Sequence, residues 1–150
     1  MRKCARCGKK RFLRTTKNHA LKVAGRTFKA TVPALRCRAC KEIVVDADAI
    51  SAVELAAAVS LVNAGRVNGE VFRFMRHALD LTSTHLAHEF GVALETVSRW
   101  EHGGQAVDRM SWLTLAAMVA DRLEHRTTTV DRLRAIRERP RLARTVRLGG

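Results

Sequence analysis

The sequence is poor in aromatic residues and in long apolar runs. It has no tyrosine, and aromatic side chains make up only 5% of its 150 residues, so we expect an aliphatic core. No stretch approaches the roughly 18 consecutive apolar residues of a membrane-spanning helix, and no hydrophobic signal segment follows Met1. These absences argue against a membrane or secreted protein and favour a cytoplasmic one.

Acidic residues are almost absent from the first 45 positions. This segment holds 14 Lys and Arg residues against one acid, Glu42, which gives a net charge of +13. Residues 46–150 hold the other 14 basic residues, all Arg, against 13 acids, a net charge of +1. Such an uneven positive charge predicts a polyanionic partner, nucleic acid above all. The alternative is a basic face that is merely solvated.

The residue patterns of enzyme active sites are also missing. There is no phosphate-binding glycine loop, no nucleophile elbow and no pair of carboxylates in a plausible cleft. The sequence therefore predicts a protein that is not an enzyme.

Two CxxC motifs stand at the ends of the basic segment, with 29 residues between Cys7 and Cys37. Two thiolates three residues apart can bind one metal ion from a tight turn, and a second pair completes a tetrahedral shell. In a reducing compartment such pairs are poor candidates for structural disulfides. The motifs therefore predict a structural zinc site, with an iron–sulfur cluster or a redox dithiol as alternatives. The ligands are Cys4, Cys7, Cys37 and Cys40, while His19 between the pairs is interpreted as a surface residue.

The segment that carries these motifs is expected to be a small module of short strands. Apolar and polar residues alternate over residues 26–35, as in a half-buried strand, and residues 43–45 are a plausible partner strand. Pro33 lacks a backbone N–H group, so the strand at residues 26–35 should lie at the edge of the sheet or end near Pro33.

From residue 46 onward Ala, Leu and Val dominate, which favours helix. The first helix is expected to begin after Asp46 or Asp48, run to about Asn63 and stop at Gly65. Its apolar residues lie nearly all round, which predicts that it packs between domains or across a dimer. Five further helices are expected, at 69–79, 83–90, 94–101, 109–124 and 128–138.

Residues 82–103 have the pattern of a helix-turn-helix. Thr82 can cap the first helix, and the small Ala87 lets a second helix cross it closely. Gly91 suits the sharp turn between the helices. Val97 packs the second helix against the first. The outer face of the second helix is then free to enter a DNA major groove.

This part of the chain, about residues 67–124, resembles the Xre/Cro family of lambda-repressor-like domains, five-helix DNA binders. The residues that carry the resemblance are Leu81-Thr82, Ala87, Gly91-Val92, Val97-Ser98 and Trp100-Glu101-x-Gly103. Together with the two CxxC motifs, nearly the whole chain is similar to the YgiT/MqsA family of zinc-finger/helix-turn-helix proteins. Members of that family include antitoxins that repress their own operon.

The resemblance implies five DNA contacts, four in the major groove and one near a phosphate: Leu94, Glu95, Thr96, Arg99 and Ser83. The side-chain chemistry agrees in part, because Arg99 can bind guanine in bidentate fashion and Glu95 can accept a hydrogen bond from cytosine. Thr96 can bond a base or touch a thymine methyl group. Arg73 and Arg76 lie one turn apart on the preceding helix and are expected to reach phosphates.

The predicted fold is thus α+β, a β-rich four-Cys zinc module followed by an all-α helix-turn-helix domain. The predicted units are the zinc module, a connecting helix with its linker, the helix-turn-helix domain with a C-terminal helix, and a basic disordered tail: 1–45, 46–66, 67–138 and 139–150.

Three functions are compatible with this organisation. The leading hypothesis is a transcriptional regulator, a homodimer that reads duplex DNA with its helix-turn-helix and contacts phosphates with its zinc module. The second is an antitoxin whose zinc module binds a toxin. The third is an RNA-binding zinc protein, which the scarcity of exposed aromatic residues disfavours.

Overall fold

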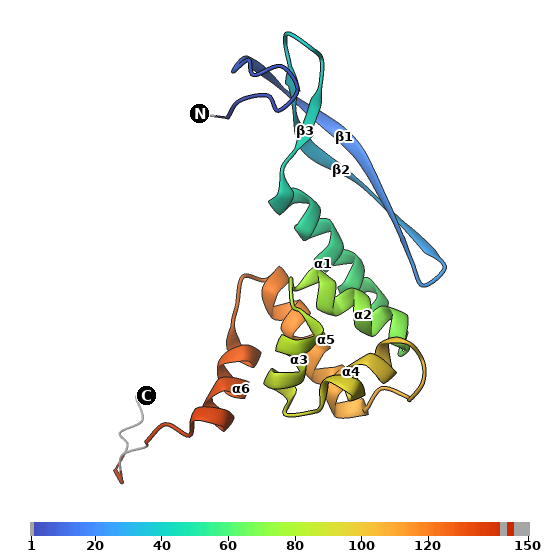
Figure 1. The fold of residues 1–150 in the computed structure, drawn as a ribbon, viewed down its shortest axis with the longest axis vertical. Coiled ribbons are helices and arrows are strands. Elements are labelled where there is room, and N and C mark those ends of the chain that lie inside the picture. Colours follow the sequence, from blue (N-terminus) through green and yellow to red (C-terminus); the bar gives the residue numbers. More distant parts are fainter. Residues whose placement is uncertain (1, 142–143, 146–150) are drawn as a thin grey trace.

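The computed structural model describes residues 2–141 and 144–145, and it has the expected α+β organisation. A three-stranded antiparallel sheet comes first, and six helices follow it (Figure 1). The strands are β1 (Phe12–Val23), β2 (Arg26–Cys37) and β3 (Ile43–Val45). The helices are α1 (Ala47–Asn63), α2 (Gly69–Ala78), α3 (Ser83–Phe90), α4 (Leu94–Glu101), α5 (Arg109–Leu123) and α6 (Thr128–Glu138). The predicted helix bounds are confirmed to within a residue or two, and the tail expected to be disordered falls largely outside the described residues.

The sheet is built on a long hairpin, not on the short strands that the sequence suggested. β1 and β2 each have 12 residues and pair from Phe12↔Cys37 to Val23↔Arg26. The predicted partner strand β3 is confirmed, and it pairs with residues 34–36 of β2. β2 is therefore the central strand, contrary to the expectation from Pro33. Proline is tolerated because β3 ends its pairing at Ala34, so β2 has only one neighbour at position 33.

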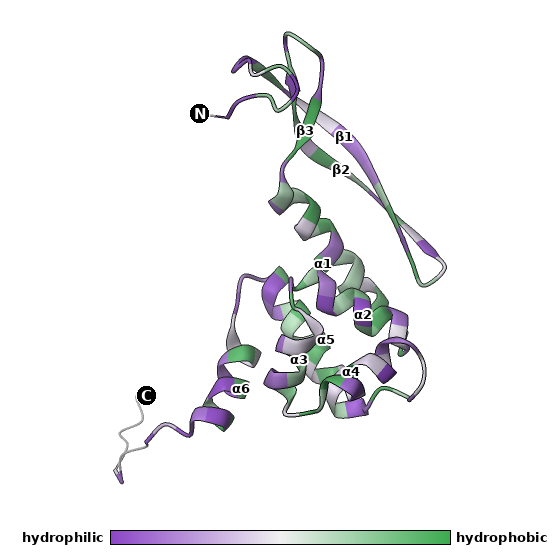
Figure 2. Cartoon of the chain, viewed as in Figure 1, coloured by the Kyte–Doolittle hydropathy of each residue, from purple (hydrophilic) through white to green (hydrophobic). Residues whose placement is uncertain are grey.

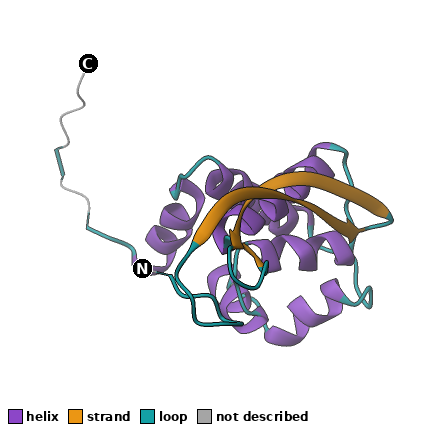
Figure 3. Cartoon of the chain, turned by 90° about the horizontal axis from the view of Figure 1, so that it is seen from above, coloured by secondary structure: helices purple, strands orange, loops and turns teal. Residues whose placement is uncertain are grey.

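Helix α1 lies between most of the sheet and the remaining helices. It packs against β2 on one side and against α2 and α5 on the other, as its all-round apolar pattern predicted. Seen from above, the strands run across the helical layer (Figure 3). The largest cluster of buried residues is continuous across both parts, since it includes Val23 of the hairpin together with Leu61 of α1 and Phe72 of α2.

The tip of the hairpin is docked on the first turn of α2. Ala24 and Gly25 form the turn with positive φ angles of 50° and 70°. The backbone N–H of Ala24 donates a hydrogen bond of 2.8 Å to Glu70 Oε1, and the neighbouring Val23 is buried. The hairpin therefore contacts the helices at its tip as well as along α1.

Gly69 begins α2 at a point of very close approach to α4. A Cβ atom at this position would collide with the carbonyl oxygen of Trp100 and lie 3.0 Å from that of Glu101. The sequence predicted only that a helix begins here, whereas the structure shows that the missing side chain lets α2 pack closely on the end of α4.

We expect Gly69→Ala to destabilise the protein, even though alanine favours helix over glycine. Overpacking of this kind costs about 1–3 kcal/mol, and urea unfolding would measure it. Gly104→Ala is the matched control, because the nearest atom to its Cβ is 3.8 Å away. Equal stability of the two variants would show that α2 can shift without cost.

The last helix, α6, is only loosely joined to the rest of the protein. It has no fully buried residue, and its sequence is mostly hydrophilic (Figure 2). At its beginning, Thr129 donates to Asp121 through its backbone N–H and its hydroxyl, and near its end Arg137 pairs with Glu89 at 2.9 Å. Within the described residues, no helix is both long and apolar enough to cross a membrane.

Candidate metal centre and nucleic-acid interface

The four cysteines predicted as metal ligands converge at one end of the sheet. Their Sγ atoms all lie within 4.8 Å of one another, with 3.6 Å from Cys4 to Cys40 and from Cys7 to Cys37. Cys4 and Cys37 are buried, whereas the other two are more exposed. His19 does not belong to this group.

Both CxxC motifs close with the same backbone turn. The N–H of Gly8 donates to the carbonyl of Cys4 at 2.8 Å, and the N–H of Lys41 donates to that of Cys37 at 3.0 Å. Gly8 and Lys41 both have positive φ, 69° and 63°. Positive φ strains a residue that carries a side chain. The turn at Lys41 therefore has a cost in backbone strain that glycine avoids in the turn at Gly8.

The spacing and electrostatics of the cluster suit a metal ion. Four thiolates at about 2.3 Å from a tetrahedrally coordinated zinc ion are about 3.8 Å apart, close to the observed separations. A hydrogen bond from the backbone N–H of Cys40 lowers the pKa of Cys37 to about 6. The backbone N–H of Glu42 lowers the pKa of Cys40, but burial and the neighbouring thiols outweigh it and raise that pKa to about 12. Thiolates this close repel each other, so all four ionise together only around a cation.

The predicted helix-turn-helix is formed by α3, α4 and the turn between them. Thr82 caps α3 by accepting a 3.1 Å hydrogen bond from the N–H of His85. Gly91 has a φ of 65° at the C-terminus of α3, and Val92 donates back to the carbonyl of Ala87. Ala93, the residue just before α4, provides no side-chain cap.

Helix α4 has one buried face and one exposed face. Val97 and Trp100 are 0% and 3% exposed, and Trp100 packs edge-to-face on Phe72 of α2 with ring centroids 5.6 Å apart. Of the residues expected in the groove, Leu94, Glu95 and Arg99 are exposed, and Thr96 is half-buried. Ser83 is half-buried at the first position of α3.

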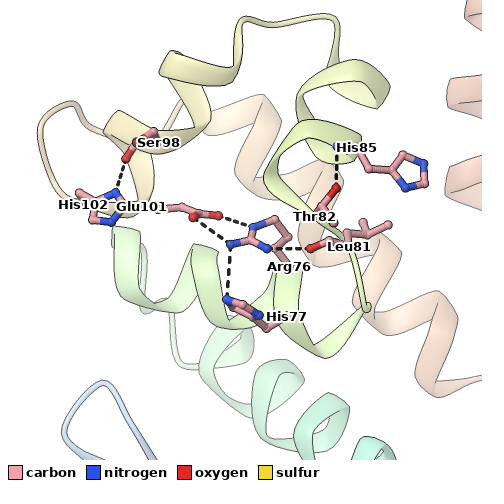
Figure 4. Close-up of polar contacts among 8 residues, drawn as sticks. All are labelled: Arg76, His77, Leu81, Thr82, His85, Ser98, Glu101 and His102. Atoms are coloured by element: carbon pink, nitrogen blue, oxygen red, sulfur yellow. Dashed lines mark hydrogen bonds and ion pairs between the residues drawn. The ribbon is translucent and has the colours of Figure 1, made fainter.

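Arg76 does not have the role that the sequence suggested. It is only 6% exposed, so it cannot reach a phosphate. Its Nε and Nη2 atoms donate to Glu101 at 2.5 and 3.0 Å, and its Nη1 donates to the carbonyl of Leu81 at 2.7 Å (Figure 4). The neighbouring Arg73 is exposed. Arg76 therefore joins α2, α4 and the loop before α3, and only Arg73 remains a candidate for phosphate contact.

Sequence reasoning assigned no structural role to Glu101, although it lay in the motif Trp100-Glu101-x-Gly103. Glu101 is 8% exposed, and its carboxylate is the partner of Arg76. A sequence signal was available, because the motif places Glu101 directly after Trp100 near the end of the helix, where both side chains are buried.

A second cationic feature lies beside the cysteines. Lys9, Lys10, Arg11 and Arg38 line one open hollow, with Ala39 as the remaining residue. The backbone holds this group together, since the N–H of Arg38 donates to the carbonyl of Arg11 at 3.0 Å. We call these four residues the basic hollow.

Comparison with protein-family models matches residues 1–142 to the model described as MqsA, the antitoxin component of a bacterial toxin–antitoxin system. The chain belongs to the MqsA antitoxin family. A search of curated proteins found no match. The family consists of antitoxins and regulators and not of enzymes, it implies a toxin partner, and MqsA-type proteins also carry a helix-turn-helix DNA-binding domain. The resemblance inferred from the cysteine motifs and the helix-turn-helix is thus confirmed.

Proposed function

We propose that this MqsA-family antitoxin is also a repressor that binds a specific operator as a homodimer. The observation that carries the proposal is the exposed face of α4, where Glu95 and Arg99 point away from a helix that buried residues hold in place. A rigid helix with free polar side chains is suited to base readout in a major groove. A symmetric dimer would present two such helices to half-sites about one DNA turn apart.

The Lys and Arg side chains of residues 2–45 would then supply affinity for DNA that does not depend on the base sequence. The basic hollow is lined by residues just before β1 and just after β2, and this end of the sheet lies away from α4 (Figure 1). Cations bind phosphates without reading bases, so this region would strengthen binding without changing the preferred sequence. Arg73 of α2, which is exposed, would contact a phosphate closer to the reading helix, and Ser83 another.

We assign zinc to the four-cysteine cluster and propose that its role is structural. Four sulfur ligands fill the coordination shell, so no position remains for a substrate. On this basis residues 1–45 are a zinc module, residues 46–66 connect it to the helix-turn-helix domain, and residues 67–138 form that domain with its C-terminal helix.

One observation favours the zinc module as the toxin-binding part as well. Leu13 and Ile43 are 46% and 41% exposed, and both pair with Arg36, so the three form one row across the sheet. Exposed aliphatic side chains suit a protein partner better than a phosphate backbone. Because the surrounding module is strongly basic, the toxin surface that docks here should combine apolar and acidic groups.

Selection of bound duplexes from random DNA, with zinc-loaded protein, tests the proposed reading helix. We expect a palindromic site, and we expect Arg99→Ala to weaken binding by about 1–3 kcal/mol and to relax the choice of one base pair. Arg132→Ala, an exposed arginine on α6, is the matched control and should leave the site unchanged. Binding without sequence preference, or with the same preference in Arg99→Ala, would refute the proposal for α4.

The salt dependence of operator binding tests the basic hollow. Replacing its four cations with glutamine should reduce the slope of log affinity against log salt by roughly one for each phosphate that the protein no longer neutralises. The preferred sequence should stay the same. These substitutions are preferable to removing the sheet, since Val23 of the hairpin belongs to the shared core. An unchanged slope would mean that the hollow does not contact DNA.

A further inference from the structure

A groove between α3 and α6 is not explained by DNA binding, by the metal site or by the toxin. It has a volume of about 540 Å³, within the range of about 300–1,000 Å³ that small-molecule sites occupy. Its apolar lining is formed by the side chains of Leu79, Leu81, Met118 and Val130. Leu79 and Met118 are buried, and the other two are half-buried.

The groove exists because α6 is attached at its two ends. Asp121 of α5 accepts hydrogen bonds of 2.8 and 2.7 Å from Thr129 at the start of α6. Glu89 of α3 pairs with Arg137 near the other end of the helix. Between these attachments the side chain of Val130 is only half-buried, so α6 bridges the space without filling it.

The charges at the rim favour an anion. The two acids that line the groove are already engaged, Glu89 by Arg137 and Asp121 by Thr129, and these contacts lower the pKa of both carboxyl groups. Arg122 also lines the groove. Among the described residues it takes part in no ion pair, and its Nη2 only donates a long 3.4 Å hydrogen bond to the carbonyl of Leu79. The two other arginines of the lining are paired, Arg126 with Asp121 and Glu124, and Arg134 with Asp131. The guanidinium group of Arg122 is therefore the one available at the edge of the apolar floor.

We propose that this groove binds an aliphatic monocarboxylate, with its chain on Leu79, Met118 and Val130 and its carboxylate on Arg122. A planar guanidinium can hold a carboxylate through two parallel hydrogen bonds. The apolar floor selects a ligand with a hydrocarbon chain over a small free anion. The site is independent of the proposed operator binding, although one wall is α3, the first helix of the helix-turn-helix.

Titration calorimetry with the zinc-loaded full chain tests the proposal, with sodium decanoate as the probe. Decanoate should bind with one site per chain, while decan-1-ol and acetate should each bind at least about 10-fold more weakly because each lacks one half of the recognition. Arg122→Gln should weaken decanoate binding by about 10-fold or more, and Arg122→Lys should recover part of it. Arg109→Gln, at the opposite end of α5, is the matched control and should bind like the unmodified protein.

Several results would overturn the assignment. Absence of saturable decanoate binding would exclude the site. Equal affinity for decanol would remove the role of Arg122, and equal decanoate affinity in Arg122→Gln and Arg109→Gln would place the ligand elsewhere. Because Arg122 is exposed, its substitution should not unfold the protein, and a thermal melt of each variant would verify this.

Discussion

Cys37→Ser is expected to abolish stoichiometric metal binding and to unfold the cysteine end of the sheet. Cys37 is fully buried and its Sγ lies 3.6 Å from that of Cys7, so no solvent ligand can easily take its place. Structural zinc contributes about 10–16 kcal/mol of apparent binding free energy in small zinc domains. Among the described residues outside the shared core, this end of the sheet buries only Cys4, Val32, Ala34 and Cys37, too little to hold its fold without the metal.

The measurement is metal content by elemental analysis together with amide hydrogen exchange along the chain. Protection should fall at the cysteine end of the sheet and persist in α2–α5, whose core does not include the cysteines. Ala39→Ser is the matched control, because Ala39 is exposed in the same CxxC motif, and this variant should retain one metal ion. Full metal content and unchanged protection in Cys37→Ser would contradict a structural metal at this site.

Glu101→Ala is expected to destabilise the helical part by about 3–5 kcal/mol, because it leaves the buried guanidinium of Arg76 without its charged partner. The pair lies between α2 and α4, with side chains 7% and 3% exposed. Guanidinium chloride unfolding would measure the change in free energy. Glu95→Ala, on the exposed face of the same helix, should change stability by less than about 0.5 kcal/mol.

A double variant separates the ion pair from simple loss of packing. Arg76→Met combined with Glu101→Leu removes both charges and should recover much of the stability that Glu101→Ala removes. In this double variant α4 should keep its position against α2, and the protein should still bind DNA. If Glu101→Ala and Glu95→Ala proved equally stable, the Arg76–Glu101 pair would not hold α4 in place.

The sequence predicted the helices well because their ends are set locally. Thr82 and Gly91 mark the ends of α3 by a cap and a left-handed turn, and both act within a few residues. The metal site was equally accessible, since each CxxC motif brings two thiols together by its own turn and only the meeting of the two turns depends on the fold.

What the sequence did not predict depends on contacts between distant segments. Arg76 looked like a phosphate ligand because nothing in α2 alone shows that its side chain turns toward Glu101, 25 residues later. Gly69 was expected only to begin a helix, because the reason for a glycine there is the close approach of the Trp100 carbonyl. Strand β1 was not predicted because polar side chains occupy most of its positions and blur the alternation of the strand.

The length of the docked hairpin would magnify any change in its orientation. Its 12-residue strands extend about 40 Å at about 3.3 Å per residue, from the turn at Ala24 to the cysteines. A tilt of 10° at the tip would therefore move the metal end by roughly 7 Å over that length. The hydrogen bond from Ala24 to Glu70 would then influence where the basic module meets a partner, although it lies far from the cysteines. A substitution at the first turn of α2 would in that case change the position of the module without altering any residue in it.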